Sequence, residues 1–285
     1  MKDLLTVSGL DVACISGKSK TPLVSGVSFT LQQGTCLGIL GESGSGKSVT
    51  CRAIMGLMQG NFSISGMAEY GGKNLLSMSE RDLRKLRGSE IAMIMQNPIS
   101  AFDPLFSIGQ QLVETFQAHR VISRNDSLEL ARSALASLLI REPELVLRSY
   151  PHQLSGGMLQ RVMIALTLAL HPRLIIADEP TTALDSVTQY EVLQELKRIR
   201  ASEDCTMIFV SHDLGALKML ADDALVMYRG KVVEYGPASE VFNNPVHEHT
   251  RYLIETRRSL TGRFVELTTG VVCRDEIRES GHAAG

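Results

Sequence analysis

Residues 36–48 read CLGILGESGSGKS, an apolar run that leads directly into a glycine-rich loop. Residues 49–58 follow with apolar side chains at helical spacing, and Gly60 lies just beyond them. A strand, a glycine-rich loop and a helix in this order turn backbone N–H groups toward a bound phosphate. The pattern G-x-x-x-x-G-K-S therefore predicts a phosphate-binding loop, whose residues are Gly41, Glu42, Ser43, Gly44, Ser45, Gly46, Lys47 and Ser48.

Two side chains of this loop carry the chemistry of a nucleoside triphosphate site. The Lys47 ammonium can reach the β- and γ-phosphates, and the Ser48 hydroxyl can ligate Mg²⁺. A chance match would lack the flanking strand and helix, whereas both are predicted here. We therefore interpret the loop as functional rather than as a structural turn.

Residues 174–179, LIIADE, end a second apolar strand in two carboxylates. We expect Asp178 near Mg²⁺, because it stands at the carboxyl end of the strand. Glu179 is one residue further, so its side chain should point elsewhere, toward a water that attacks the γ-phosphate. An ordinary acidic strand end is the alternative, and the phosphate-binding loop favours the functional interpretation.

Two further polar residues follow predicted strands. Gln96 comes after the apolar run 91–95, and His212 comes after the run 206–210. A neutral amide can ligate Mg²⁺ or water without adding charge. A lone histidine after a strand is more often structural, but a shared sheet edge with Ser48 and Asp178 favours a functional role.

The composition limits the classes of protein to consider. The 285 residues are 44% hydrophobic and 21% charged, and the net charge of −2 argues weakly against nucleic acid as the main partner. The five cysteines form no CxxC pair, and the N-terminus lacks a signal-peptide core. No run approaches the ~18 apolar residues needed to span a bilayer. We expect a cytoplasmic protein, which would have to dock onto other chains if it acts on a membrane.

The remaining pattern predicts three kinds of organisation. Residues 4–13 and 24–31 resemble antiparallel strands, and a hairpin is predicted around Arg229-Gly230. Residues 98 to about 170 have helical periodicity, including a helix with Asp126 as N-cap and Glu129 completing a capping box. A helical stretch between the runs 174–178 and 206–210 predicts that these two strands are parallel.

A second glycine-bearing helix start occurs at 154–161, LSGGMLQR. Together with GESGSGKS, Gln96, LIIADE, ALD at 183–185 and VSHD at 210–213, it makes a set that resembles the nucleotide-binding subunit of the ABC transporters. The resemblance covers nearly the whole chain. It implies an α/β fold, with a RecA-like P-loop NTPase core, an antiparallel β subdomain and an inserted α-helical subdomain at about 98–170. The nucleotide-binding domain would span 1–262, followed by a partly disordered tail at 263–285.

The resemblance also implies roles and cofactors. In this family two such domains dimerise head to tail, so the helix start at Ser155, Gly156 and Gly157 would cap the γ-phosphate of ATP held by a partner. It implies Mg²⁺ held by Ser48, Gln96 and Asp178, and ATP hydrolysis with Glu179 polarising water. It further implies that His212 contacts the γ-phosphate, and that Asp185 links this histidine to the partner.

Two departures from the family pattern stand out. The aromatic residue that usually stacks on adenine is replaced by Cys14, so we expect weaker ATP binding and some tolerance of GTP. The usual LSGGQ ends in Met158 here, which removes a side-chain hydrogen-bond donor but leaves the backbone cap intact.

The finer resemblance is to importers of peptides and nickel. SGGMLQR, AFDP, ADEPTTALD and the stretch 246–260 fit this group, closest to the D-type ATPase of nickel or metal-chelate import. Peptide-importer subunits usually carry clustered tail cysteines, whereas only Cys273 lies in this tail. Nickel or a nickel chelate is therefore favoured over dipeptides or oligopeptides, and a non-transport ABC ATPase is a remote alternative.

This resemblance implies a set of partners and a location. We expect two separate membrane permease subunits, an extracytoplasmic substrate-binding protein, and either a paralogous second ATPase or a homodimer. The protein would lie at the cytoplasmic face of the membrane. His247 and His249 form an HxH pair, which we interpret as a solvated helix start rather than a metal site.

Overall fold

The computed structural model describes residues 2–58, 60–203 and 205–257. The predicted tail at 263–285, including Cys273, lies outside the described residues. A six-stranded sheet, in the order β10-β9-β3-β8-β7-β6, forms the centre. Its strands are β3 (Cys36–Gly41), β6 (Ile91–Ile94), β7 (Leu174–Asp178), β8 (Thr206–Val210), β9 (Asp223–Tyr228) and β10 (Lys231–Pro237).

The central sheet is parallel except at one edge. Strands β6, β7, β8, β3 and β9 pair in parallel, and β10 pairs antiparallel with β9. The predicted parallel pairing of the runs 174–178 and 206–210 is therefore confirmed, as is the hairpin at Arg229-Gly230. All carboxyl ends of the parallel strands meet at one edge, where ligands bind in open α/β sheets.

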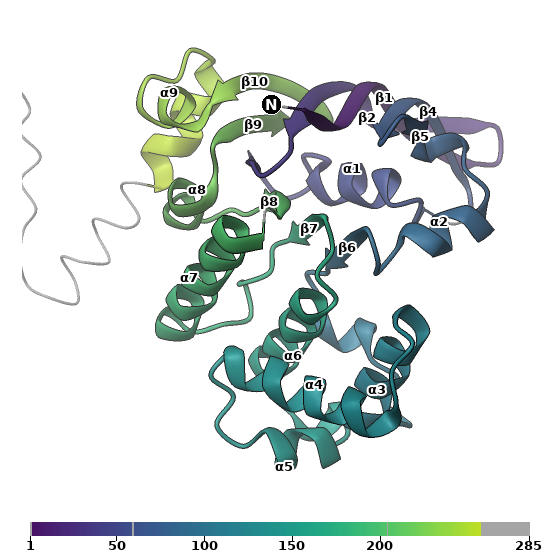
Figure 1. Ribbon diagram of the computed structural model, residues 1–285. Helices are drawn as coiled ribbons and strands as arrows, with labels where there is room; N and C mark the ends of the chain where they lie inside the picture. Colours follow the sequence, from purple (N-terminus) through teal and green to yellow (C-terminus); the bar gives the residue numbers. More distant parts are fainter. Residues whose placement is uncertain (1, 59, 204, 258–285) are drawn as a thin grey trace, which may run out of the picture.

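Both faces of the sheet are covered, which explains its uniformly apolar strands. In β7, Leu174 and Ile176 belong to one buried cluster, while Ile175 and Ala177 belong to the other. Helix α1 (Lys47–Ile54) lies on the first face, beneath the second sheet (Figure 1). The helices α6 (Gly156–Ala169), α7 (Ser186–Glu203), α8 (Leu214–Leu220) and α9 (Ala238–Asn243) belong to the other side of the molecule.

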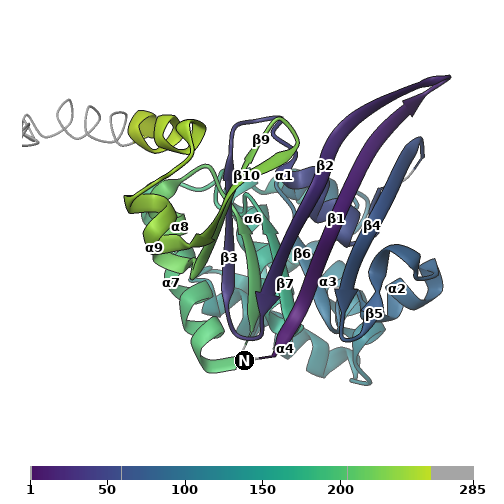
Figure 2. The ribbon, with the colours of Figure 1, turned by 90° about the horizontal axis from the view of Figure 1, so that it is seen from above.

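A second sheet, in the order β2-β1-β4-β5, is antiparallel throughout. Figure 2 shows β1, β2 and β4 running side by side above the core. Their apolar face packs on α1, so the helix is enclosed between two sheets. The bounds are β1 (Asp3–Ser16), β2 (Ser19–Gln32), β4 (Phe62–Tyr70) and β5 (Lys73–Asn74), followed by η1 (Leu75–Ser77) and α2 (Glu80–Leu86).

Between β6 and β7 the described chain forms only helices and turns. They extend away from the sheet at the lower end of Figure 1. These elements are η2 (Pro98–Ala101), α3 (Ile108–His119), α4 (Arg124–Ser137), α5 (Pro143–Arg148), η3 (Pro151–Gln153) and α6. The predicted fold class, a P-loop core with an antiparallel β subdomain and a helical subdomain, is confirmed.

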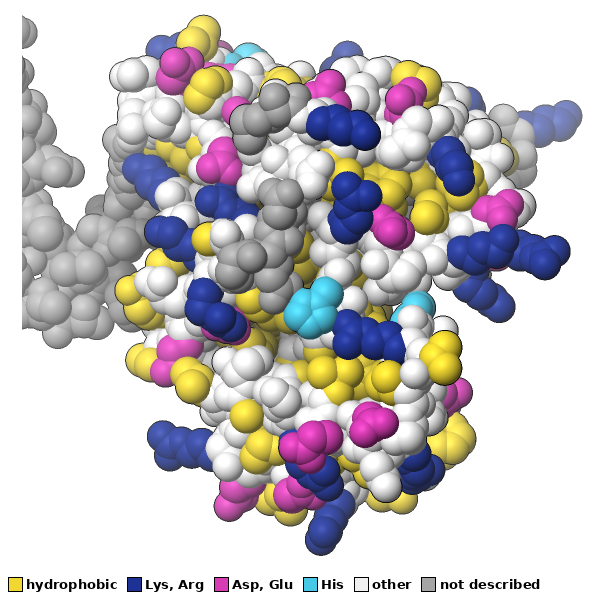
Figure 3. All heavy atoms as spheres, viewed as in Figure 1, with side chains coloured by type: hydrophobic (Ala, Val, Ile, Leu, Met, Phe, Trp, Pro, Cys, Tyr) yellow, Lys and Arg dark blue, Asp and Glu magenta, His cyan; other side chains and the backbone are white. Residues whose placement is uncertain are grey.

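Three further features concern the surface charge, the last described helix and membrane spans. On the face seen in Figure 3, acidic and basic side chains are interspersed. Residues 248–257 form a further helix beyond α9. No helix within residues 2–58, 60–203 and 205–257 is both long and apolar enough to cross a bilayer.

Two local predictions are wrong. Helix α1 ends at Ile54, four residues before the predicted end, because Gly56 turns the backbone to φ +64°. Helix α4 begins after Ser123, whose hydroxyl accepts a hydrogen bond from the Asp126 N–H at 3.1 Å. Asp126 is therefore in the first turn rather than at the N-cap.

Candidate functional site: a phosphate-loop cleft

The glycine-rich loop joins the buried strand β3 to helix α1 in a tightly packed turn. A Cβ added at Gly41 would lie 2.5 Å from both the Met227 carbonyl oxygen and the Ser45 Oγ. Gly46, the N-cap of α1, has φ +104°, a conformation that residues with a Cβ rarely adopt. The chain can follow this path only with glycine at these positions, which leaves the first N–H groups of α1 directed at the cleft.

Lys47 lies folded into the loop. Its Nζ donates hydrogen bonds to the carbonyl oxygens of Gly41 at 3.0 Å and Glu42 at 2.8 Å, and the residue is 5% exposed. Burial lowers the pKa of the Lys47 ammonium, and the carboxylates of Glu179 and Asp178 oppose that shift. A cation enclosed by backbone oxygens is thus available at the point where the loop turns.

Ser48 and Asp178 meet directly, although they are far apart in the sequence. The Ser48 Oγ donates to the Asp178 Oδ1 at 2.8 Å. Asp178 is fully buried, and its Oδ2 has no hydrogen-bond partner. Burial raises the pKa of this carboxyl, and the Ser48 hydrogen bond opposes the shift. A buried carboxylate oxygen without a partner beside a hydroxyl fits a hard cation such as Mg²⁺.

The backbone takes an unusual conformation at Glu179, the residue after Asp178. Glu179 has φ +49°, which is uncommon for a residue other than glycine, and its N–H donates to the Val210 carbonyl oxygen at 3.0 Å. Its Oε2 accepts hydrogen bonds from Gln96 Nε2 at 2.9 Å and Thr182 Oγ1 at 3.2 Å. The His212 Nδ1 lies 3.4 Å from the same oxygen.

The sheet edge therefore gathers the polar residues that the sequence placed after the strands. Gln96 follows β6, Asp178 and Glu179 end β7, and His212 follows β8. Sequence reasoning did not single out Thr182, although a hydroxyl three residues after Glu179 was a visible signal. Of these groups, Gln96 and Glu179 line a cleft of about 460 Å³. Its lining residues are Pro22, Leu23, Ser43, Gly44, Gly46, Lys47, Ser48, Val49, Gln96, Glu179, Arg229 and Gly230.

A second helix start lies elsewhere on the same chain. Ser155 is the N-cap of α6, and its Oγ accepts from the Met158 N–H at 3.2 Å. Ser155 and Gly156 are exposed, and a Cβ added at Gly156 would meet nothing within 4 Å. Gly157 packs against the loop before α7, because an added Cβ would lie 3.0 Å from the Ala183 carbonyl oxygen.

Asp185 caps helix α7 rather than reaching the cleft. Its Oδ1 accepts from the N–H groups of Val187 at 3.1 Å and Thr188 at 3.0 Å. The backbone and side-chain hydrogen bonds from Thr188 hold the pKa of Asp185 below its usual value. Among the described residues, the cleft lining includes neither Asp185 nor the helix start at Ser155–Gly157.

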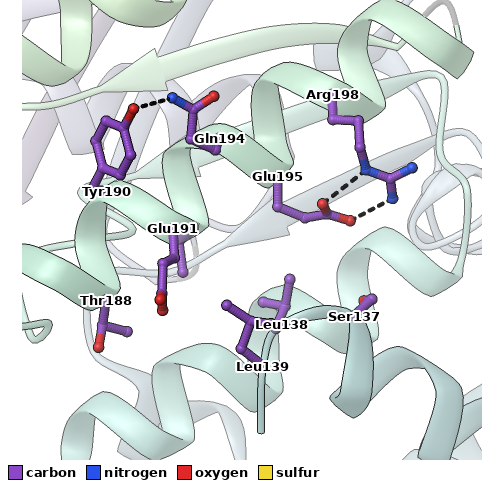
Figure 4. A pocket seen from close by; sticks show the side chains of 10 residues that line it. Ser137, Leu138, Leu139, Thr188, Tyr190, Glu191, Gln194, Glu195 and Arg198 are labelled. Atoms are coloured by element: carbon purple, nitrogen blue, oxygen red, sulfur yellow. Dashed lines mark hydrogen bonds and ion pairs between the residues drawn. The ribbon is translucent and has the colours of Figure 1, made fainter.

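A hollow of similar size, about 470 Å³, lies between α7 and the segment after α4 (Figure 4). Leu138 and Leu139 line one side of it. Its polar side chains are already paired: Gln194 donates to the Tyr190 hydroxyl at 2.7 Å, and Arg198 bonds Glu195 at 2.6 and 2.9 Å. The hollow offers no glycine-rich turn for phosphate, so the loop cleft is the better nucleotide site.

Cys14 and the histidine pair were singled out from the sequence. Cys14 is partly exposed on β1, opposite Thr21 of β2 and Phe62 of β4. The His247 Nδ1 accepts from the His249 N–H at 3.1 Å. Within the described chain, no three His, Cys, Asp or Glu residues gather as a metal site would require.

Comparisons with known proteins agree on one family. The model described as "ABC transporter" matches residues 24–182. A metal-staphylopine import ATP-binding protein, CntD of Staphylococcus aureus, is 45% identical over 94% of this chain and 98% of its own length. The oligopeptide transport ATP-binding protein OppD of Salmonella typhimurium is 39% identical over 93% of this chain and 79% of its own.

A solved structure is similar over most of the chain. The ATP-binding cassette MJ0796, as a dimer in a post-hydrolysis state with ADP and Pi, gives a TM-score of 0.75 at 25% identity. The similarity covers 82% of this chain and 99% of that one.

Proposed function

This chain belongs to the ABC transporter family, in the group of ATP-binding proteins for peptide and nickel import, and we propose that it powers import of a metal chelate. As a member of this family it binds and hydrolyses ATP. The observation that carries the proposal is the 45% identity to a metal-staphylopine import protein over almost the full length of both chains.

The proposed cargo is a divalent metal, nickel included, held by an organic chelator. The relative named for oligopeptide transport is less similar, at 39%, and this chain spans 79% of it. The cargo itself would be recognised by an extracytoplasmic binding protein and by the permeases. This chain supplies the free energy of ATP hydrolysis, and the described residues offer no cluster for the metal.

Phosphate and magnesium binding are assigned to the loop and the end of β7. We assign the β- and γ-phosphates to the N–H groups of residues 41–48 and to the Lys47 ammonium, which is buried beside them. Ser48, Asp178 and Gln96 would hold Mg²⁺, and the partnerless Oδ2 of Asp178 supports this. When bound, the ion neutralises phosphate charge that develops during hydrolysis.

Glu179 is assigned to the attacking water. Its carboxylate accepts hydrogen bonds from Gln96 and Thr182, at a backbone turn where Glu179 has φ +49°. Such an oxygen can accept a proton from a water in line with the γ-phosphate. His212, at 3.4 Å from the Glu179 Oε2, is assigned to the γ-phosphate on the same side of the cleft.

The exposed start of α6 supports pairing with a second ATPase. In the proposed dimer, Ser155, Gly156 and Gly157 of one copy cap the γ-phosphate on the other, and Asp185 lies at the same interface. Gly156 is exposed and without close neighbours, as a surface that receives a ligand from outside requires. The chain carries both half-sites, so a homodimer and a pair with a paralogue are each compatible.

A surface for the permeases lies next to Gln96. Ile99, Leu105 and Phe106 are 63%, 77% and 49% exposed, an unusual concentration of bare apolar side chains. We propose that two separate permease subunits form the membrane channel, and that this segment receives a cytoplasmic helix from one of them. The protein would thereby sit peripherally at the cytoplasmic face of the membrane, and the Gln96–Glu179 contact would connect docking to hydrolysis.

Peptide import is the second candidate, favoured by the 39% identity to the oligopeptide transport protein. Both cargoes are compatible with the same catalytic cleft. The two functions differ only in the permeases and the binding protein that work with this ATPase, and hence in the cargo.

Uptake in cells decides between them. Cells carrying the parent chain, Glu179→Gln or the exposed control Glu69→Gln receive labelled nickel, with or without a chelator, and a labelled dipeptide. Metal uptake lost only in Glu179→Gln supports metal import. If dipeptide uptake is the one lost in Glu179→Gln, the protein powers peptide import instead. If Glu179→Gln changes the uptake of neither cargo, a transport role for these substrates is contradicted.

A further inference from the structure

The turn between β9 and β10 forms part of the wall of the nucleotide cleft. Arg229 and Gly230 line it together with Pro22 and Leu23 of β2. The Gly230 N–H donates to the Ser45 carbonyl oxygen at 3.0 Å, which ties the turn to the phosphate loop. The Gly230 carbonyl oxygen accepts from the Ser25 N–H at 2.8 Å, which ties it to β2.

An arginine is an unexpected residue at the first position of this turn. Arg229 has φ +47° and Gly230 has φ +79°, and two-residue turns of this kind favour Asn-Gly or Asp-Gly. A residue with a long side chain adopts the left-handed conformation at a local energetic cost. Backbone strain of this kind clusters at ligand sites, so its place at the rim of the cleft indicates a role for the Arg229 side chain.

The guanidinium of Arg229 has an aromatic support. Its Cζ lies 5.0 Å from the centroid of the Tyr228 ring. Tyr228 in turn packs on His249 of the 248–257 helix, with ring centroids 3.9 Å apart. Among the described residues no carboxylate forms an ion pair with Arg229, so its charge is not neutralised within this part of the chain.

The order of strands places Arg229 relative to the phosphates. Strand β9 neighbours β3 on one side, whereas β8, β7 and β6 lie on the other. Arg229 therefore flanks the phosphate loop opposite to Gln96 and Glu179, which mark the γ-phosphate end in the proposed function. A nucleotide extending from that end brings its α-phosphate, ribose and base toward the Arg229 side.

We propose that Arg229 contacts the bound nucleotide at its base end, with Tyr228 and His249 as positioning residues. A guanidinium donates hydrogen bonds to phosphate and ribose oxygens and stacks on the faces of bases. Ala13, the residue before Cys14, pairs with Pro22, and Pro22 lines the same cleft as Arg229. Arg229 therefore lies near the region where Cys14 replaces the aromatic residue of the family pattern. The inference rests on the assignment of the cleft to ATP in the proposed function.

The test compares equilibrium binding of two nucleotides, MgADP and the non-hydrolysable triphosphate Mg-adenylyl imidodiphosphate. For Arg229→Ala we expect both dissociation constants to rise about 5- to 20-fold, because a charged hydrogen bond or stack is lost. Lys231→Ala removes an equal charge from an exposed position of the same hairpin and should change neither constant more than about twofold.

Each other outcome overturns the proposal. An unchanged MgADP affinity in Arg229→Ala, or a loss confined to the triphosphate, would exclude contact at the base end. An equal loss of affinity in Lys231→Ala would show that net charge, rather than contact with Arg229, strengthens nucleotide binding. If the folded parent chain bound neither nucleotide, the proposed function would fail and the inference with it.

The positioning role of His249 has its own readout. His249→Ala should weaken both nucleotides about 2- to 5-fold, less than Arg229→Ala, because only the support of Tyr228 is removed. His249→Phe keeps a ring against Tyr228 and should restore the affinity. His249→Ala should cause no additional loss when it is combined with Arg229→Ala, because it acts through the arginine, and a clear additional loss would contradict the positioning role. Failure of His249→Phe to restore the affinity would contradict ring packing as the cause.

Discussion

The starts of helices α1 and α6 both carry glycines, but their surroundings differ. At α1 the loop is enclosed: Ser45 and Lys47 are 3% and 5% exposed, and Gly46 at φ +104° replaces a side-chain cap. At α6 the start is open: Ser155 caps its own helix, and Gly156 has no neighbour within 4 Å of an added Cβ.

In the proposed function, this difference would distinguish a complete nucleotide site from half of one. The α1 start has an ammonium, a hydroxyl and a partnerless carboxylate oxygen beside it, all from the same chain. Apart from the Met158 N–H, which donates to the Ser155 hydroxyl, the α6 start offers N–H groups at an exposed surface, where no hydrogen-bond acceptor from another segment of the described chain meets them. A helix start of the second kind acquires a ligand when another molecule brings it.

The largest expected effect concerns the enclosed site. Glu179→Gln should lower the rate of ATP hydrolysis by at least about 100-fold, because a group that accepts the proton from water is lost. ATP affinity should persist, since glutamine keeps the shape and Lys47 and Ser48 are untouched. Steady-state hydrolysis and equilibrium ATP binding are the measurements; Glu69→Gln is the control, and a loss of binding would contradict the assigned role.

The next effect concerns the open helix start. Gly156→Asp should reduce ATP hydrolysis by about 10-fold or more in the assembled ATPase, because a carboxylate would repel the partner's γ-phosphate. The melting temperature and ATP affinity of the isolated chain should not change, since the position is open. Normal hydrolysis by Gly156→Asp would contradict the proposal that the α6 start completes the nucleotide site of the partner.

A smaller effect is expected at Cys14, on the base side of the enclosed site. Cys14→Tyr restores an aromatic face and should tighten ATP binding about 5-fold or more, within the range of base–aromatic stacking. The tolerance of GTP that we expect from the missing aromatic residue should fall at the same time. Binding of both nucleotides can be titrated, with Cys14→Ser as the control; weaker ATP binding in Cys14→Tyr would show that this residue does not face the base.

The smallest effect concerns stability. Burial raises the pKa of Asp178, so its charged form destabilises the fold at neutral pH, and this loss disappears as the pH falls through that raised pKa. Asp178→Asn should raise the melting temperature without Mg²⁺ by about 2–4 °C at pH 7. Thermal melts should show this gain shrinking at acidic pH. A lower melting temperature at pH 7 would contradict an uncompensated buried charge.

The sequence predicted which polar residues lie together at the sheet edge because the signals are local. The pattern at 41–48 follows an apolar strand directly, and Gln96, Asp178 and His212 each follow a strand of their own. Parallel strands bring such residues to one edge, so a correct reading of the strands was sufficient. The sharp turn at Glu179 was only implied, because a positive φ at a glutamate leaves no mark in the sequence.

Only the first of the two errors involves a contact between distant segments. Helix α1 was predicted to continue to residue 58, but Arg87 donates to the carbonyl oxygens of Met55 at 3.0 Å and Gly56 at 2.9 Å. These bonds satisfy the end of the helix from 31 and 32 residues away. At α4, Ser123 and Asp126 are both good caps, and only the structure shows which one begins the helix.

Arg229 illustrates a third limit. Its place in a hairpin was predicted, but its position beside the phosphate loop depends on two hydrogen bonds made by Gly230. No spacing rule in the sequence connects residue 229 with residue 45. A functional residue contributed by a turn of one strand pair to the loop of another therefore requires the structure.

Self-association of the Glu179→Gln chain with and without ATP tests the central claim most directly, by sedimentation velocity. If the start of α6 completes the site at α1 of another copy, ATP should convert monomers to dimers, and adding Gly156→Asp should keep the chain monomeric although it still binds ATP. A dimer that is indifferent to Gly156→Asp would contradict the account, whereas a chain that binds ATP but stays monomeric would exclude the homodimer and leave only the pair with a paralogue.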